Sequence, residues 1–257
     1  MPPSKPLTTT AEFTTTRISP PGPNTPLTLP TRTVPFPYGN PMVLNDALAV
    51  RLEVFVDEQK CAAEFELDND DARSWHWVLY DENAVVPGAK SAVRLPVAVI
   101  RLVPPPHAPH EHESGHGDGS NVTENGNGIV NGSAKYDMKH EPYIKFGRVA
   151  VLAAYRGLGL ARRLIETGMK WAEENAGEIN RALADDVEKE SLERKGAEAE
   201  AETEPVPMPV WKGLALVHAQ VDVEKMYARL GFVTDESMGT WVEEGIYHVA
   251  MWKRLNV

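Results

Sequence analysis

A glycine-rich turn offers the clearest chemistry in this chain of 257 residues. It reads Arg156-Gly157-Leu158-Gly159-Leu160-Ala161, directly after an apolar run and directly before a helical pattern. Glycines let backbone N–H groups approach an anion closely, and the start of a helix adds partial positive charge. Arg156 adds a guanidinium group that can bind a phosphate with two hydrogen bonds. The segment therefore predicts a site for a phosphate or pyrophosphate group.

Three kinds of phosphate loop compete for this segment, together with a simple turn that binds nothing. A Walker loop needs Gly-Lys-Ser/Thr, which the segment lacks. A dinucleotide-binding loop needs a small residue three positions after Gly159, where Arg162 stands. It also needs an acidic residue at the end of the next strand, about 20 residues on, where an acidic run occurs instead. The third kind, Arg/Gln-x-x-Gly-x-Gly/Ala, fits at every position.

Residues suited to proton transfer occur on both sides of this loop. Glu64, Glu66 and Asp68 alternate within one segment, and His76 follows at the start of an apolar run. His218 lies inside another apolar run, where a packing role competes with a chemical one. Arg148 precedes the loop and is suited either to orient a substrate or to pair with a carboxylate.

Helices and strands must position these side chains. Periodicity predicts helices over 44–56, 161–175 and 223–230, the second ending at Gly177. Strands are expected over 75–80, 97–103, 143–152, 214–220, 232–233 and 247–252. This order indicates one domain with a mixed α/β sheet.

Three segments lack the pattern of a core element. Residues 1–35 are rich in Pro, Thr and Ser and are expected to form a disordered tail before a domain over 36–257. Residues 104–140 form a low-complexity insertion, in which the setting of His107, His110, His112 and His116 favours a flexible loop over a metal site. Residues 178–209 form an acidic insertion, expected as a solvated helix with an extended exit.

The composition excludes several classes of function. The net charge of −11 argues against non-specific nucleic-acid binding, although residues 178–204, with ten acids and four bases, carry −6 of it. No window approaches the roughly 18 apolar residues of a membrane span, and the N-terminal MPPSKPLTTT lacks the apolar core of a signal peptide. A single cysteine, Cys61, favours a reducing compartment, either cytosol or nucleus. No metal is expected, and a homodimer stays open.

Four motifs in the same order resemble the GNAT acetyltransferase superfamily. These are the loop itself, the entry segment 51–76, the segment Val217–Phe232 with a Tyr and a final Gly-Phe, and the ending Glu243-Glu-Gly-Ile-Tyr-His248. The entry segment and the ending are similar to the ElaA-like branch, which in turn is similar to glucosamine-6-phosphate N-acetyltransferases. The resemblance implies a single-domain GNAT fold, a mixed and mostly antiparallel sheet flanked by helices.

The resemblance also implies the cofactor and its site. Acetyl-CoA would act as co-substrate, with the pantetheine arm along the strand before the loop and the pyrophosphate in the loop. The residues implied are Val149, Ala150, Val151, Arg156, Gly157, Leu158, Gly159, Leu160 and Ala161. An N–H group of Val149 or Ala150 would hold the oxyanion.

By the same resemblance, Tyr227 would give a proton to the leaving thiolate, with Glu66 and His76 as candidate bases. For Glu66 a solvated loop carboxylate is the competing interpretation, and for His76 a hydrogen-bonded core histidine. The expected acceptor is a small primary amine such as an amino-sugar phosphate. A protein lysine acetyltransferase and a non-catalytic CoA-binding module are the alternatives.

Overall fold

The computed structural model of the protein describes residues 12–108, 140–197 and 208–257. Its strands are Phe13–Ile18 (β1), Trp75–Ala84 (β2), Val93–Val103 (β3), Tyr143–Val151 (β4), Leu214–Gln220 (β5), Val233–Thr234 (β6), Thr240–Glu243 (β7) and Ile246–Arg254 (β8). Its α-helices are Met42–Arg51 (α1), Leu160–Glu174 (α2), Ala176–Ala197 (α3) and Glu224–Arg229 (α4).

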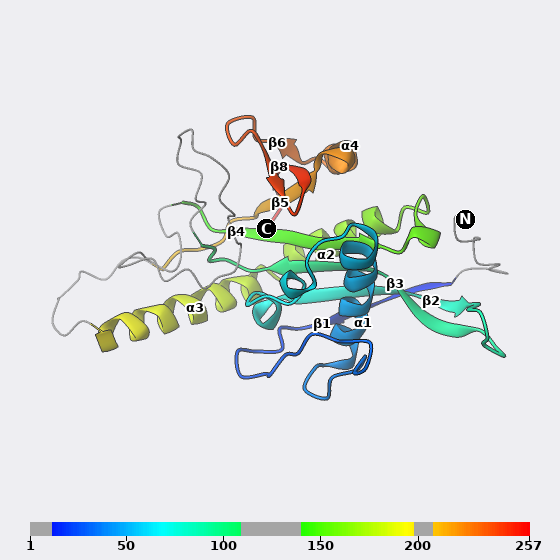
Figure 1. The fold of residues 1–257 in the computed structure, drawn as a ribbon. Helices are drawn as coiled ribbons and strands as arrows, with labels where there is room; N and C mark the ends of the chain where they lie inside the picture. The colour runs from blue at the N-terminus through cyan, green and yellow to red at the C-terminus, as the bar shows by residue number, and fades with distance from the viewer. Residues whose placement is uncertain (1–11, 109–139, 198–207) are drawn as a thin grey trace.

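One eight-stranded sheet organises the molecule (Figure 1). Its order is β1-β2-β3-β4-β5-β8-β6, and β7 also pairs with β8. Among the described strand pairs, β4 and β5 form the parallel one and the others are antiparallel. The expected mixed, mostly antiparallel sheet flanked by helices in a single domain is confirmed.

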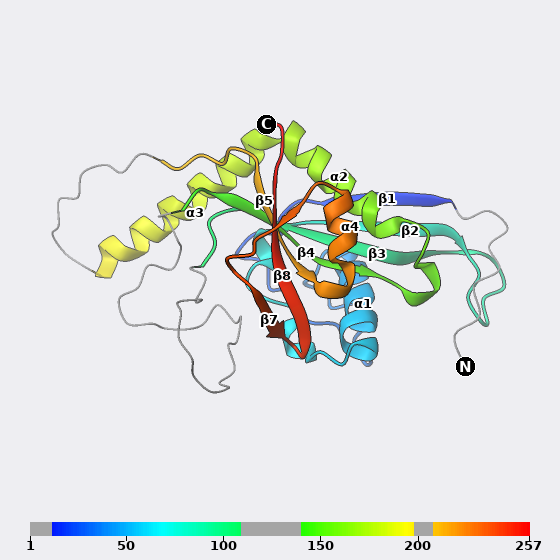
Figure 2. The same cartoon turned by 90° about the horizontal axis from the view of Figure 1, so that it is seen from above.

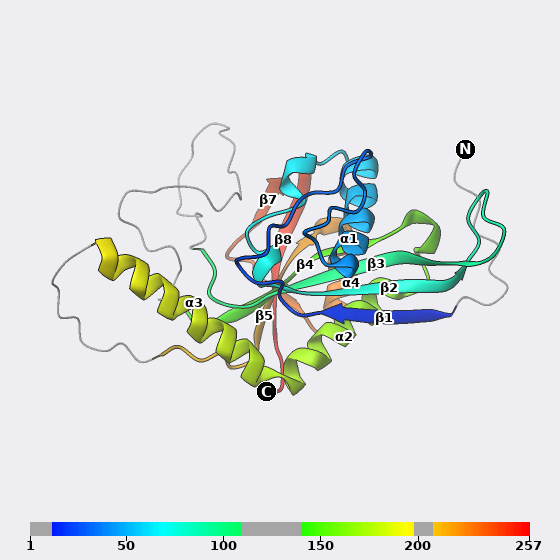
Figure 3. The ribbon, with the colours of Figure 1, turned by 90° about the horizontal axis from the view of Figure 1, so that it is seen from below.

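The central strands are covered by helices on both faces. Helix α1 packs on one face and α2 on the other, as the views from above and below show (Figures 2 and 3). Strand β2 explains this from its sequence, because successive side chains point to opposite faces. Trp75 and Trp77 contact Trp171 of α2, with ring centroids 4.8 and 5.5 Å apart. His76, between them, faces the side of α1.

The first helix changes from α-helical to π-helical geometry partway along its length. The sequence pattern predicts one helix over 44–56, and the structure has α1 followed directly by a π-helical segment, Leu52–Glu58 (η1). Of the expected apolar face, Leu48 and Val54 are buried and Leu52 and Phe55 are half-buried, and Leu44 is buried as well. Arg51, between the two segments, is fully buried. Short π-helical segments of this kind occur frequently at functional sites.

The predicted disordered tail 1–35 is wrong for residues 12–35. Phe13–Ile18 forms edge strand β1, paired with β2 over six residues. The Pro, Thr and Ser composition concealed three consecutive β-branched threonines, which favour a strand once a neighbouring edge is available. The segment that follows is held by Asn40, which bonds to Thr28 and Asn45. Residues 1–11 lie outside the described part of the chain.

Both predicted insertions begin later than expected. Pro104, Pro105 and Pro106 are buried, and Arg73 donates hydrogen bonds to two of their carbonyl groups. The acidic segment begins as helix α3, whose Ile179 and Leu183 belong to the buried interior. Gly177, expected to end the preceding helix, lies in the first turn of α3, since α2 already ends at Glu174. The histidines at 110, 112 and 116 lie outside the described residues.

Candidate active site

Strands β4 and β5 separate halfway along their length. Their parallel pairing runs from Tyr143 opposite Leu214 to Phe146 opposite Val217 and then ends. Beyond this point β4 continues along β3, whereas β5 continues along β8, and the two strands fan apart (Figure 2). Residues 147–151 of β4 and 218–220 of β5 therefore border an opening in the sheet. Val149, Ala150 and Val151, expected along the pantetheine arm, lie on its β4 side.

A β-bulge lies where the strands part. Gly147 pairs with Arg101 and Ala150 with Val99, so two residues of β4 oppose one residue of β3. Arg148 adopts a φ of 51°, a left-handed conformation that is costly for a residue with a side chain. Bulges re-aim side chains and are frequent next to active sites. Here the bulge turns the Arg148 side chain toward the segment that carries Glu66.

The glycine-rich loop follows β4 at the same end of the opening. A single 3₁₀ turn, Ala153–Tyr155 (η4), leads into Arg156, and α2 starts at Leu160. Gly157 and Gly159 have φ values of 77° and 76°, and a Cβ atom at either would meet open space. The loop thus presents an unobstructed backbone at a helix start, and the first turn of α2 has no acidic residue. These features fit a pyrophosphate group.

Arg156 is already engaged by a carboxylate. Its two terminal nitrogens bind the two carboxylate oxygens of Glu58, each at 2.6 Å, and its Nε donates to the carbonyl of Val151. Gln59, the residue directly after η1, bonds through its side-chain amide to Gln220 at the end of β5. Two consecutive residues of this segment therefore reach both sides of the opening. No motif or periodicity predicted these contacts.

Glu66 belongs to a buried network of charges. Its Oε2 lies 3.1 Å from Nε of Arg51 and 3.8 Å from Nε of Arg148, and its carbonyl accepts a hydrogen bond from Arg51. Arg51 also binds Asp71 at 2.7 Å, and Arg101 binds Asp68 at 2.6 and 2.9 Å. Three arginines thus face three carboxylates, which is the arrangement that buried charges require.

This network departs from the interpretation of Glu66 as a solvated loop carboxylate, since only 4% of Glu66 is exposed. Burial disfavours the charge of Asp71, but the guanidinium groups of Arg51 and Arg101 outweigh it and hold its pKa well below the usual value. Periodicity could not reveal the network, because Arg51 and Arg101 lie in segments whose patterns predict only a helix and a strand.

His76 is fully buried under the same network. Its Nε2 lies 3.2 Å from the carbonyl oxygen of Asp71, and burial lowers its pKa to about 4 against the attraction of the Asp71 carboxylate. With 0% exposure, its ring has no contact with solvent. This geometry fits the competing interpretation of His76 as a core histidine that supports the segment around Glu66.

Tyr227 lies on the other face of the sheet, in α4. It is 5% exposed, and its ring makes an edge contact with Phe232, with centroids 5.8 Å apart. Burial raises the pKa of its hydroxyl, which therefore keeps its proton at neutral pH. A protonated hydroxyl is what a proton donor needs.

Other candidates take supporting positions. His218 follows the last β4–β5 pair and makes an edge contact with Trp241 at 4.9 Å. Burial and the nearby charges of Glu244 and Glu66 raise the pKa of the Cys61 thiol, which makes it a poor nucleophile. Among the described residues, no group of three His, Cys, Asp or Glu side chains could hold a metal ion, and no helix is long and apolar enough to cross a membrane.

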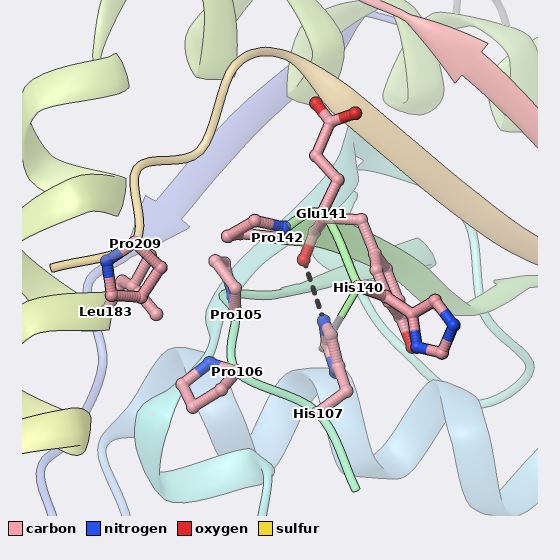
Figure 4. Close-up of a pocket in the computed structure, with 9 residues that line it drawn as sticks. Pro105, Pro106, His107, His140, Glu141, Pro142, Leu183 and Pro209 are labelled. Atoms are coloured by element: carbon pink, nitrogen blue, oxygen red, sulfur yellow. Dashed lines mark hydrogen bonds between the residues drawn. The ribbon is translucent and has the colours of Figure 1, made fainter. Parts of the chain in front are cut away.

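A hollow lies elsewhere, lined by residues 105–107 and 140–143 together with Leu183 and Pro209 (Figure 4). Four of its nine lining residues are prolines, and His107 stacks on Tyr143 and bonds to its carbonyl oxygen. Tyr143 begins β4, so this hollow is at the opposite end of the strand from the glycine-rich loop. It is therefore separate from the candidate site.

Comparisons with known proteins identify the family of the chain. The family model of the acetyltransferase (GNAT) family matches residues 51–194. A search of curated proteins found no match.

Solved structures also resemble the chain. They include an acyl-CoA N-acyltransferase from Pseudomonas aeruginosa, at 21% identity over 95% of this chain and 99% of that one, with a TM-score of 0.46. ElaA of Escherichia coli is similar at 16% identity over 95% and 100%, with a TM-score of 0.41. NAA60 of Arabidopsis thaliana, solved with acetyl-CoA, is similar at 10% identity over 96% and 100%, with a TM-score of 0.45. The family match alone covers more than half of the chain, and the chain accordingly belongs to the GNAT family of acetyltransferases, N-acyltransferases that use acetyl-CoA.

Proposed function

We propose that this enzyme transfers the acetyl group of acetyl-CoA to a small primary amine by direct attack within a ternary complex. The observation that carries the proposal is the opening between β4 and β5, which ends at an unobstructed glycine-rich loop and a helix start. Residues 156–161 would bind the pyrophosphate, and the backbone of Val149, Ala150 and Val151 would border the pantetheine arm and the thioester. Holding amine and thioester side by side supplies much of the rate, since effective molarities can reach about 10⁵ M or more.

The two proposed proton transfers would take place on opposite sides of the opening. Glu66 lies on the α1 side and is the proposed acceptor of the amine proton, directly or through water. Oε2 of Glu66 faces the arginines, and Oε1 has no hydrogen bond among the described residues. Tyr227 lies on the side of α2 and α4 and is the proposed donor to the thiolate. His76 is fully buried and would not contact the amine. Its role would be to support the segment that carries Glu66.

Two contacts across the acceptor side favour a small molecule. The backbone N–H of Ala62 donates to Glu244 at the β7–β8 turn, at 2.9 Å, and Gln59 bonds to Gln220. These contacts close the edge along which an extended peptide would have to lie. An amino-sugar phosphate remains the first acceptor that we propose, and a protein lysine is the alternative outcome.

The test is a panel of amines incubated with acetyl-CoA, with release of the CoA thiol and the product mass as readouts. The panel should pair an amino-sugar phosphate with the same sugar without phosphate, a polyamine, an amino acid and a lysine peptide. We expect a mass increase of one acetyl group on a small amine. Acetylation of the peptide alone would overturn the small-molecule proposal, and no transfer to any amine would overturn the proposed function.

A further inference from the structure

Arg148 is the point at which the strand beside the thioester meets the segment that carries Glu66. Its Nη2 donates to the carbonyl oxygen of Phe65 at 2.9 Å and lies 3.2 Å from Asp68. Its Nε lies 3.8 Å from the Glu66 carboxylate. One side chain therefore contacts three residues of the segment 65–68. We name this segment the acceptor segment.

The backbone of Arg148 is strained in the conformation that makes this contact. Arg148 occupies the left-handed position of the bulge, where glycine is the usual residue. Non-glycine residues persist in such conformations only where the surroundings hold them, and they cluster at active sites. A glycine would form the same bulge without strain but would leave the acceptor segment without its guanidinium contact.

The fold does not depend on Arg148 for its charge balance. Asp68 is bound twice by Arg101, at 2.6 and 2.9 Å, and Asp71 is bound by Arg51, whose side chain is fully buried. Asp68 also accepts hydrogen bonds from the backbone of residues 70 and 71. Arg148 is the more exposed partner, with 23% of its side chain accessible. Its removal therefore leaves every carboxylate of the network with another arginine.

We propose that Arg148 is a positioning residue, which fixes the acceptor segment and the Glu66 carboxylate against the thioester strand. This inference rests on the proposed function, in which Glu66 takes the proton of the amine. Arg148 would touch neither the amine nor the thioester. Its effect would be to keep Glu66 at hydrogen-bonding distance from the attacking nitrogen.

Two variants separate this role from simple stabilisation. Arg148→Gly and Arg148→Ala both remove the guanidinium, but only the alanine keeps the strained backbone. We expect both to lower kcat by the same factor, about 10-fold or more, with the Kd for acetyl-CoA changed less than about twofold. The glycine variant should melt at a higher temperature than the alanine variant. Arg148→Lys should recover part of the activity, because an ammonium group can reach one of the three partners.

Lys60→Gly is the matched control for the backbone, since Lys60 is exposed and also has a positive φ of 69°. It should melt no lower than the wild type and keep its turnover. The proposal would be overturned if kcat followed the melting temperature, with the kcat of Arg148→Gly close to that of the wild type and only Arg148→Ala impaired.

Hydrogen exchange tests the same inference without any acceptor. In Arg148→Gly, the amides of Phe65, Glu66 and Asp68 should exchange faster, while those in the middle of β2 should not change. Unchanged exchange at residues 65–68 would show that Arg148 does not hold the segment. Failure of the wild type to acetylate any amine would sink the proposed function but leave this measurement to decide the anchoring.

Discussion

At the scale of single residues, the Tyr227 hydroxyl is protonated at neutral pH, as that of any tyrosine is, and burial raises its pKa further. Tyr227→Phe keeps the ring and its edge contact with Phe232, so packing should change little. We expect acetyl-CoA affinity to be retained and kcat to fall roughly 10- to 100-fold, because general acid catalysis is worth about 10²-fold or more and a thiolate is a fair leaving group.

Tyr80→Phe is the matched control for Tyr227→Phe. It removes a hydroxyl that donates to Asp46 at 2.8 Å, away from the opening. This control should lower stability by about 1 kcal/mol and leave kcat unchanged. Turnover of Tyr227→Phe within about twofold of wild type would identify Tyr227 as a core residue.

Gly159 tests whether the loop binds the pyrophosphate. Acetyl-CoA should raise the melting temperature of the wild type, because a ligand selective for the folded state stabilises it. Gly159→Glu should abolish this rise by placing an anion at the phosphate site. Gly22→Glu is the control, since Gly22 also has a positive φ and open space around its Cβ position. It should lose comparable stability and keep the ligand shift; equal ligand shifts in both variants would show that the loop is not the site.

His76 predicts how stability depends on pH. Its pKa is about 4 in the folded protein and 6.5 for an unperturbed histidine, so below pH 6.5 the unfolded chain binds a proton that the folded chain does not. Its contribution is complete above pH 6.5 and is lost as the pH falls toward 4, by at most about 3.5 kcal/mol at about 1.4 kcal/mol for each unit of pKa. Denaturant unfolding should show a shallower loss over this window for His76→Gln. Equal slopes for both proteins would contradict the assignment.

At the scale of elements, hydrophobic periodicity predicted the strands and helices whose apolar residues recur regularly along the sequence. The strand over 214–220 was predicted with its observed bounds, and the helix after the loop within one residue at each end. The pattern could not predict the π-helical turn after Arg51, nor the bulge at Arg148, because both depend on partners distant in sequence. β1 was missed for the same reason, since its threonines form a strand only against the edge of β2.

The described residues on either side of 109–139 are already in contact. His107 and Tyr143 stack with ring centroids 4.3 Å apart, so the ends of a shorter connection are held together. Replacing residues 109–139 by a short Gly/Ser linker should therefore leave the melting temperature and acetyl-CoA binding nearly unchanged. A matched deletion that also removes residues 104–108 should destabilise the protein, because three buried prolines and two acceptors of Arg73 are lost. Equal stability of the two deletions would show that the prolines contribute nothing.

At the scale of the whole molecule, the site joins elements from most of the chain. The loop and α2 would bind the cofactor, the end of η1 and the residue after it contact both sides of the opening, and the buried charges hold the acceptor segment. The order of motifs predicted the family. The contacts that couple its parts could not be predicted, since each joins residues that are far apart in sequence, such as Glu58 with Arg156 and Phe65 with Arg148.

The N-terminal strand belongs to this coupling. Phe13 makes an edge contact with Tyr155 in the turn before the loop, with centroids 6.3 Å apart, and its carbonyl accepts from Arg163 of α2. Arg17 lies over Trp171, 4.8 Å from the ring centroid.

A chain that starts at residue 19 therefore loses an edge strand, an aromatic pair and a cation–π contact, whereas one that starts at residue 12 keeps them. We expect the shorter chain to lose on the order of 3 kcal/mol, since the aromatic and cation–π contacts alone are worth about 1 kcal/mol each. It should also bind acetyl-CoA more weakly, because Tyr155 and α2 flank the loop. Melting curves with and without acetyl-CoA measure both effects, and identical curves for the two chains would show that β1 is dispensable to fold and site alike.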